Sequence, residues 1–152
     1  MAKRIKQEVI IAKVAELVRK DIGSIPRINW GGCGVVAHNL YKTLDKLNLK
    51  PKVVALTYNP KSIHCYDADF DHIILKVGKY FIDSTGYYKR KRDIPDTSKR
   101  AYMAQVDFET LLEWLEVCKW NPAFDMGTYK PIIEKTFKKI LRKVKKDLVV
   151  SE

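Results

Sequence analysis

The fold is decided by the stretch NWGGCGVVA at residues 29–37, which runs directly into HNLYKTL at residues 38–44. Glycines stand on both sides of Cys33, and the apolar residues that follow recur every three or four positions. This pattern predicts a loop that leads into a helix over residues 32–47, with the thiol in the first turn. A helix N-terminus carries partial positive charge, which favours a thiolate over a thiol. The stretch is therefore typical of a nucleophilic cysteine.

Length and composition indicate one globular domain. The chain has 152 residues, of which 46% are hydrophobic and 31% are charged, and this balance excludes a disordered chain. No apolar run reaches the ~20 residues that a membrane span needs. Residues 1–13 lack the apolar core and the cleavage site of a signal peptide. We therefore expect a single domain over residues 1–152 that works in the cytoplasm and not in a membrane.

The cysteines favour a reducing compartment. Cys33, Cys65 and Cys118 are an odd number and show no C-x-x-C spacing, so we expect no disulfide framework. His64 precedes Cys65 directly, but no second pair at zinc spacing accompanies it. We accordingly expect no metal site and no cofactor.

The net charge of +11 is high for a chain of this size. It is concentrated near the N-terminus, in residues 89–92 and in the last predicted helix beyond residue 131. A basic chain can bind nucleic acid, an acidic protein or an anionic membrane face, or its charges can simply solvate the surface. Tyr87 and Tyr88 precede the run at 89–92, where aromatic rings could stack on bases while cations meet phosphates. The sequence alone leaves these alternatives open.

Apolar periodicity and breaker residues predict an α+β order. The predicted helices cover residues 4–20, 32–47, 108–120 and 131–148, and the predicted strands cover residues 52–58, 71–77 and 80–84, with a short strand at 102–106. Gly78 and Lys79 form the turn of a hairpin. Residues 59–70 and 87–104 are otherwise expected to be loops. The helix that bears Cys33 should pack on a small antiparallel sheet, with additional helices near both ends of the chain.

Two further polar residues complete a candidate catalytic set. His72 opens the hairpin's first strand and Asp83 ends its second, so the open end of the hairpin should bring them together. In cysteine catalysis a histidine takes the thiol proton and later donates it to the leaving group, while a carboxylate holds the other ring nitrogen. We predict Cys33 as nucleophile, His72 as general acid and base, and Asp83 as the orienting group. The structural alternatives are packing for Cys33, a surface position for His72 and turn formation for Asp83.

The order of these motifs resembles the transglutaminase-like core of the papain-like cysteine peptidase superfamily. The similarity covers residues 30–86, with Gly32-Cys33 opening a helix, residues 49–54 leading into a strand, Asp71-His72 on a strand, and residues 80–85. The resemblance implies a helix packed on an antiparallel sheet and a Cys–His–Asp triad. It also implies acyl transfer through a thioester, by hydrolysis, deamidation or transamidation of a peptide, protein or other amide substrate.

Two departures from the family pattern concern the histidine and the aspartate. The family's Asp-Pro-Thr is here Asp83-Ser84-Thr85, and Ile73 stands where an aromatic residue often follows the histidine. The motif does not fix which hydrogen-bond donors would stabilise an oxyanion. The backbone N–H of Cys33 is one candidate, and the Asn29 amide or the Trp30 indole is the other.

An alternative function is a catalytically idle module of the same fold that binds nucleic acid or an acidic protein through its basic surface. Binding of that kind should weaken steeply with salt and survive Cys33→Ala. Residues 120–125, WNPAFD, look like the tail of small proteins carried by tailed bacteriophages. That similarity implies a place in the host cytoplasm.

Overall fold

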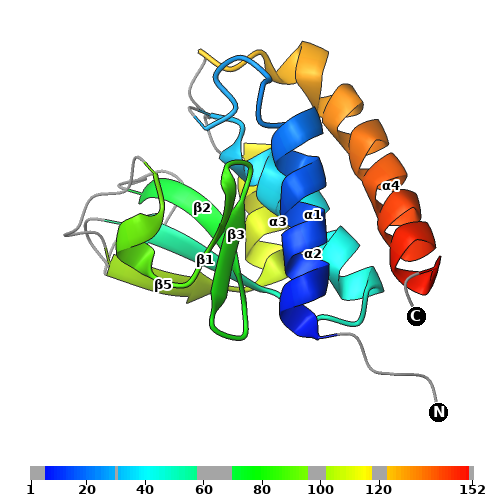
Figure 1. The fold of residues 1–152 in the computed structure, drawn as a ribbon. Coiled ribbons are helices and arrows are strands. Elements are labelled where there is room, and N and C mark those ends of the chain that lie inside the picture. The colour runs from blue at the N-terminus through cyan, green and yellow to red at the C-terminus, as the bar shows by residue number, and fades with distance from the viewer. Residues whose placement is uncertain (1–5, 30, 58–69, 96–101, 118–122, 151–152) are drawn as a thin grey trace.

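A computed structural model describes residues 6–29, 31–57, 70–95, 102–117 and 123–150. These ranges form an α+β fold of four α-helices and one five-stranded antiparallel sheet (Figure 1). The helices are α1 (Gln7–Asp21), α2 (Cys33–Lys46), α3 (Phe108–Val117) and α4 (Met126–Val150). The strands are β1 (Lys52–Thr57), β2 (Phe70–Val77), β3 (Tyr80–Asp83), β4 (Gly86–Tyr88) and β5 (Tyr102–Val106), and one 3-10 turn, η2, covers Lys91–Asp93. The expected α+β class is confirmed, as is the packing of the Cys33 helix on an antiparallel sheet.

The sheet is ordered β4-β3-β2-β1-β5, and each neighbouring pair is antiparallel. The hairpin of β2 and β3 pairs Val77 with Tyr80 and Leu75 with Ile82. Gly78 takes the positive φ of +57° that this two-residue turn requires. The turn predicted at residues 78–79 is therefore present, and it sets the register that places the catalytic candidates.

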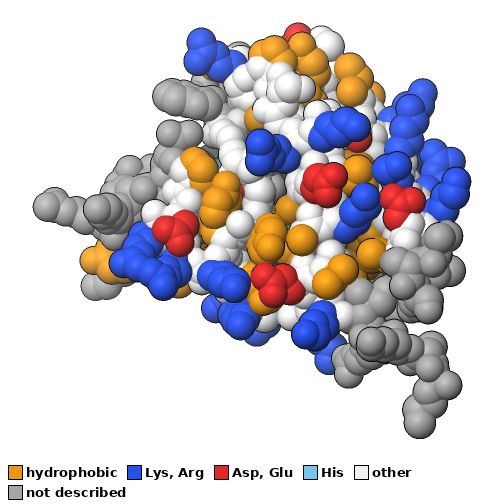
Figure 2. All heavy atoms as spheres, viewed as in Figure 1, with side chains coloured by type: hydrophobic (Ala, Val, Ile, Leu, Met, Phe, Trp, Pro, Cys, Tyr) orange, Lys and Arg blue, Asp and Glu red, His pale blue; other side chains and the backbone are white. Residues whose placement is uncertain are grey.

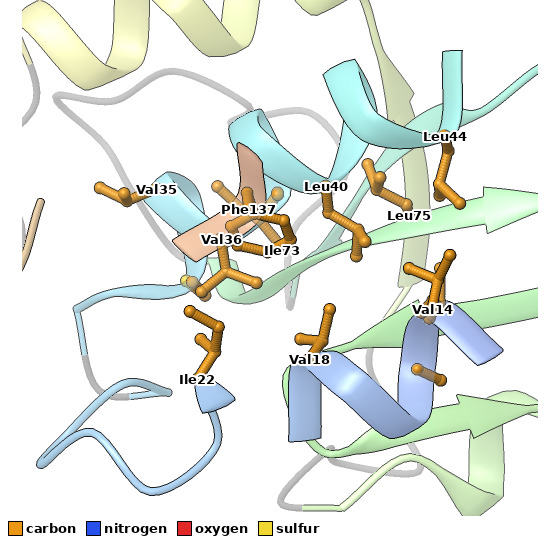
Figure 3. Packing of buried hydrophobic residues seen from close by; sticks show 14 of the residues in the cluster. Val14, Val18, Ile22, Val35, Val36, Leu40, Leu44, Ile73, Leu75 and Phe137 are labelled. Carbon is orange, nitrogen blue, oxygen red and sulfur yellow. The ribbon is translucent and has the colours of Figure 1, made fainter. Parts of the chain in front are cut away.

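The main core lies between the sheet and the helices. Figure 3 shows residues of α1, α2 and β2 meeting there, among them Val14, Val18, Val36, Leu40, Leu44, Ile73 and Leu75. α4 packs against α1 and α2 through Phe137 and its neighbours. A smaller cluster covers the opposite face of the sheet and consists of Val54, Leu56, Ile74, Phe81 and Ile94. Because both faces are covered, adjacent residues of β2 are buried, which explains its continuous apolar run.

Two elements differ from the sequence-based expectation. Residues 87 and 88 were expected to begin a long loop, but together with Gly86 they form β4, which pairs with β3 after a tight turn. Gly86 has φ +146° at that turn, and three residues are too few for a detectable alternation. α4 begins at Met126 and not at Pro131, because Asp125 caps it: the Thr128 N–H donates to Asp125 Oδ1 at 3.1 Å.

The predicted loop at 59–70 lies almost entirely outside the described residues, except that Phe70 belongs to β2. Within the described ranges, no helix has both the length and the hydrophobicity needed to cross a bilayer.

Candidate active site

Cys33 is the first residue of α2, as the glycine-rich approach predicted. Its side chain is buried, with 7% of the residue exposed. Gly32 precedes it in a tight space, where an added Cβ would lie 2.6 Å from the Ile28 carbonyl oxygen and 3.0 Å from the Phe124 ring. Glycine is therefore required before the thiol because other parts of the chain approach this position closely, and not because its backbone angles are unusual.

His72 and Asp83 are in direct contact. His72 Nε2 lies 2.9 Å from Asp83 Oδ2, and both residues are almost fully buried in the sheet. His72 belongs to β2 and Asp83 ends β3, so the hairpin register joins two residues that are eleven positions apart. The contact expected at the open end of the hairpin is thus present.

The Asp83 carboxylate is held on its other side by the next turn. Its Oδ1 accepts hydrogen bonds from the Thr85 N–H at 2.8 Å and from the Thr85 hydroxyl at 2.6 Å. The Thr85 hydroxyl has one proton, which goes to Asp83, so the Tyr88 hydroxyl at 2.7 Å donates to Thr85. Burial alone would raise the pKa of Asp83, but the hydrogen bonds from His72 and Thr85 lower it. The carboxylate is therefore ionised and fixed in orientation.

His72 is protonated under neutral conditions. Burial by itself would lower its pKa, yet the interactions with Asp83 and Cys33 raise the pKa to about 10. Nε2 is engaged by Asp83, so Nδ1 is the ring nitrogen left to interact with Cys33. The three predicted residues, carried by α2, β2 and β3, therefore lie together around one small space.

Asn29 lies beside this group, linked to the residue that follows Asp83. The Ser84 hydroxyl donates to Asn29 Oδ1 at 2.6 Å, across 55 positions of sequence. This bond turns the side-chain oxygen of Asn29 toward Ser84 and leaves the NH₂ group as the donor that Asn29 can offer a ligand. Trp30, the other predicted oxyanion donor, lies outside the described residues.

A crevice joins these polar groups. It is lined by Asn29, Cys33, His72, Asp83 and Ser84 together with apolar residues of α2 and the sheet. The space within it is too narrow for a water molecule. A molecule that approaches the sulfur through this crevice would therefore have to displace neighbouring side chains.

Three residues beside the triad were not assigned to this site from the sequence, namely Ser84, Thr85 and Tyr88, and Tyr88 was considered there only as a ring that could stack on bases. The available signal for Thr85 was the Asp-x-Thr spacing, since an aspartate often accepts bonds from the residue two positions later. His38 lies apart from the site: its ring stacks on Phe108 at 5.4 Å between centroids. Cys65, Cys118 and His64 lie outside the described residues.

Among the described residues, no group of three or more His, Cys, Asp or Glu side chains is placed to hold a metal ion. Comparisons with protein families, with curated protein sequences and with solved structures give no significant match. The geometry of this site and the motif order of the sequence are therefore the features that bear on function.

The buried ion pair should make stability depend on pH in a definite direction. The pKa of His72 is raised to about 10, so its contribution is complete below the unfolded value of about 6.5 and disappears as the pH rises through 10. Asp83 has a lowered pKa, so its contribution disappears when the solution becomes strongly acidic. We expect the stability advantage of the parent over His72→Gln, by urea unfolding, to shrink by a few kcal/mol between about pH 6 and pH 10.

His38→Gln provides the control for this measurement. Burial, followed by the charge of Lys42, lowers the pKa of His38, so its contribution is present at high pH and is lost as the pH falls. The two variants should therefore show pH trends of opposite sign. An advantage over His72→Gln that grows with pH would show that His72 is neutral in the folded protein.

Proposed function

We propose that the protein is a cysteine-dependent acyl-transfer enzyme, a peptidase or amidase, with Cys33, His72 and Asp83 as its catalytic triad. The single observation that carries this proposal is the convergence of the three side chains. His72 bonds Asp83 through Nε2 at 2.9 Å, and Cys33 lines the same crevice as this pair. A helix N-terminus adds partial positive charge at the sulfur.

The arrangement supports a two-step reaction. The Cys33 thiolate attacks the substrate carbonyl carbon, a C–S bond forms, and the carbonyl oxygen becomes an oxyanion. As the C–N bond breaks, His72 Nδ1 gives its proton to the leaving amine, which leaves a thioester on Cys33. His72 then takes a proton from water, the resulting hydroxide attacks the thioester, and the sulfur departs as a thiolate. An amine in place of water would give transamidation, and a glutamine side chain as substrate would give deamidation.

Asn29 is the proposed side-chain donor to the oxyanion. Its side-chain oxygen is fixed by Ser84, so its NH₂ group is oriented before substrate binds. The Cys33 N–H is the second proposed donor, because the first residue of a helix has no intrahelical acceptor for its N–H. Fixed donors of this kind stabilise the charge that develops on the oxygen.

The motif order and the α+β fold together favour a transglutaminase-like relative of the papain-like peptidases. The substrate class that follows is a peptide, protein or other amide, and the reaction requires no cofactor. The similarity of residues 120–125 to phage proteins adds the host cytoplasm as the proposed location.

Alkylation of Cys33 tests the triad without knowledge of the substrate. In a background with Cys65→Ser and Cys118→Ser, iodoacetamide would modify Cys33 alone, and mass spectrometry would give the rate at pH 6 and pH 9. Burial slows both rates alike, so their ratio reports the thiolate population. An ordinary thiol with a pKa near ~8.5 reacts roughly 200-fold more slowly at pH 6 than at pH 9. We expect the alkylation rate of the parent at pH 9 to exceed its rate at pH 6 by less than about fivefold. For His72→Ala, this ratio of rates should be at least about ten times larger than in the parent.

His38→Ala is the matched control, since this histidine is on the same helix as Cys33 but contacts Phe108 instead of the thiol. It should leave the ratio unchanged. Equal ratios in the parent and in His72→Ala would contradict the triad and would favour the catalytically idle module.

A further inference from the structure

The outermost helix of the fold carries most of the net charge. α4 contains eight Lys and Arg residues and two carboxylates, which is more than half of the chain's net charge of +11. Its buried stripe consists of Ile133, Phe137, Ile140 and Val144 and packs toward α1 and α2. Figure 1 shows α4 on the outside of the helical layer, and Figure 2 shows Lys and Arg side chains gathered along that side.

The cations of α4 share one solvent face. At about 100° per residue, seven of them fall within an arc of roughly 160° that is centred opposite the buried stripe. These seven exposed residues are Lys135, Lys138, Lys139, Arg142, Lys143, Lys145 and Lys146. The two carboxylates, Glu134 and Asp147, lie at the margins of the arc. Asp147 is already bridged to Lys13 at 3.4 Å and to Lys143 at 3.8 Å, so the centre of the face is uniformly positive.

α2 extends this positive face. A crevice of about 190 Å³ runs between α2 and α4, where Lys42 and Lys46 meet Lys138, and Glu134 is its one carboxylate among the described residues. Burial, followed by the charge of Lys42, lowers the pKa of His38 in the same crevice, while the charge of Glu134 acts in the opposite direction. The three lysines outnumber the one carboxylate, so the described lining of the crevice carries net positive charge.

We propose that this surface, the seven cations of α4 together with Lys42 and Lys46, binds the phosphate backbone of double-stranded nucleic acid. Lys135 to Lys146 span about 17 Å of helix, a length over which a duplex presents roughly ten phosphate charges. The surface is distinct from the triad and uses none of its residues. The proposed contacts are to the phosphate backbone, so the affinity should not depend on the base sequence.

The side chains of this face favour a duplex over the alternatives. Interfaces between proteins are depleted in lysine and enriched in aromatic anchors, whereas the one large hydrophobic residue exposed along the described part of α4 is Ile132. Single strands are held by aromatic rings that stack on bases. The aromatic residues of α4 are Tyr129, which is half-buried, and Phe137, which is buried.

The run at 89–92 fits nucleic acid less well. Tyr87 and Tyr88 are half-buried, and the Tyr88 hydroxyl is bonded to Thr85. Lys89 lies 3.8 Å from Glu8. The rings therefore contribute to the structure around Asp83, and this segment offers no open stacking platform.

Fluorescence anisotropy with a labelled 24-base-pair DNA of mixed sequence tests the proposal on the full chain. The variant Lys138→Gln/Lys139→Gln/Arg142→Gln should raise the Kd at least tenfold in 50 mM salt. It should also reduce the slope of log K against log salt by about 2.7, because three phosphate contacts are lost. The matched control Lys79→Gln/Arg90→Gln/Arg92→Gln removes the same charge from exposed positions on the sheet side and should change the Kd less than threefold.

Four results would overturn the proposal. These are no duplex binding by the parent, equal losses in both triple variants, tighter binding of a single strand, and tighter binding of polyglutamate, which would assign an acidic protein partner. Circular dichroism and thermal melting confirm that each variant is folded. Cys33→Ser should bind DNA as the parent does, so this proposal and the proposed catalysis can fail independently.

Discussion

Asp83→Asn is expected to slow acylation of Cys33 by roughly 10³-fold while the fold persists with reduced stability. The asparagine oxygen can still accept both hydrogen bonds from Thr85, so the turn after β3 is retained. Its amide nitrogen then faces His72 Nε2, where a carboxylate oxygen lies at 2.9 Å in the parent. Because the amide donates, Nε2 must accept, and the ring proton moves to Nδ1. That tautomer cannot take the thiol proton, and a charged imidazolium loses its partner.

A small activated ester such as p-nitrophenyl acetate measures this effect. Nitrophenolate release gives the acylation rate, and intact mass spectrometry shows the acetyl group on Cys33. Asp93→Asn is the matched control, because Asp93 is exposed in η2 and the chemical change is identical. It should acylate at the parent rate. If Asp83→Asn also stays within about threefold of the parent, Asp83 serves only to shape the turn.

The sequence predicted the parts of this site that follow from local patterns. The glycines and the helical spacing beyond Cys33 locate the thiol at a helix start, and the turn at Gly78 fixes which residues lie at the open end of the hairpin. That register is sufficient to bring His72 to Asp83. Their roles in catalysis remain a proposal that the experiments above address.

The remaining contacts depend on tertiary structure. Ser84 bonds Asn29 across 55 positions, and no periodicity relates two residues that meet only when a loop packs on a turn. Tyr88 reaches Thr85 because β4 pairs with β3, yet β4 has three residues and was expected to be a loop. The predicted start of α4 was wrong for a different reason. Proline is common in the first turn of a helix, so the prediction began the helix at Pro131 and overlooked the cap at Asp125.

Gly32→Ala should destabilise the protein by about 3 kcal/mol, the largest stability effect we expect from one methyl group. Gly32 has φ −93° and ψ −8°, angles that other residues also adopt, so the cost is steric. The added Cβ would lie 2.6 Å from the Ile28 carbonyl oxygen, 2.8 Å from Ile28 Cδ1 and 3.0 Å from the Phe124 ring. A backbone oxygen cannot rotate away, so the loop before α2 has to move.

Gly127→Ala is the control for this substitution. A Cβ there would have Asp125 Oδ1 as its nearest neighbour, at 3.9 Å, and the position is in the first turn of α4. Alanine is the better helix former, so stability should change by less than about 1 kcal/mol and in the favourable direction. Urea unfolding of both variants gives the comparison, and equal stabilities would show that the Ile28 loop yields without cost.

The same clash links packing to the proposed chemistry. Movement of the Ile28 loop shifts the first turn of α2, and with it the Cys33 sulfur, relative to a histidine that the sheet holds in place. Gly32→Ala should therefore also widen the gap between the alkylation rates at pH 6 and pH 9, toward the behaviour of His72→Ala. A destabilised variant that keeps the parent ratio would mean that the thiol and the imidazole move together, and that the glycine serves the fold and not the reaction.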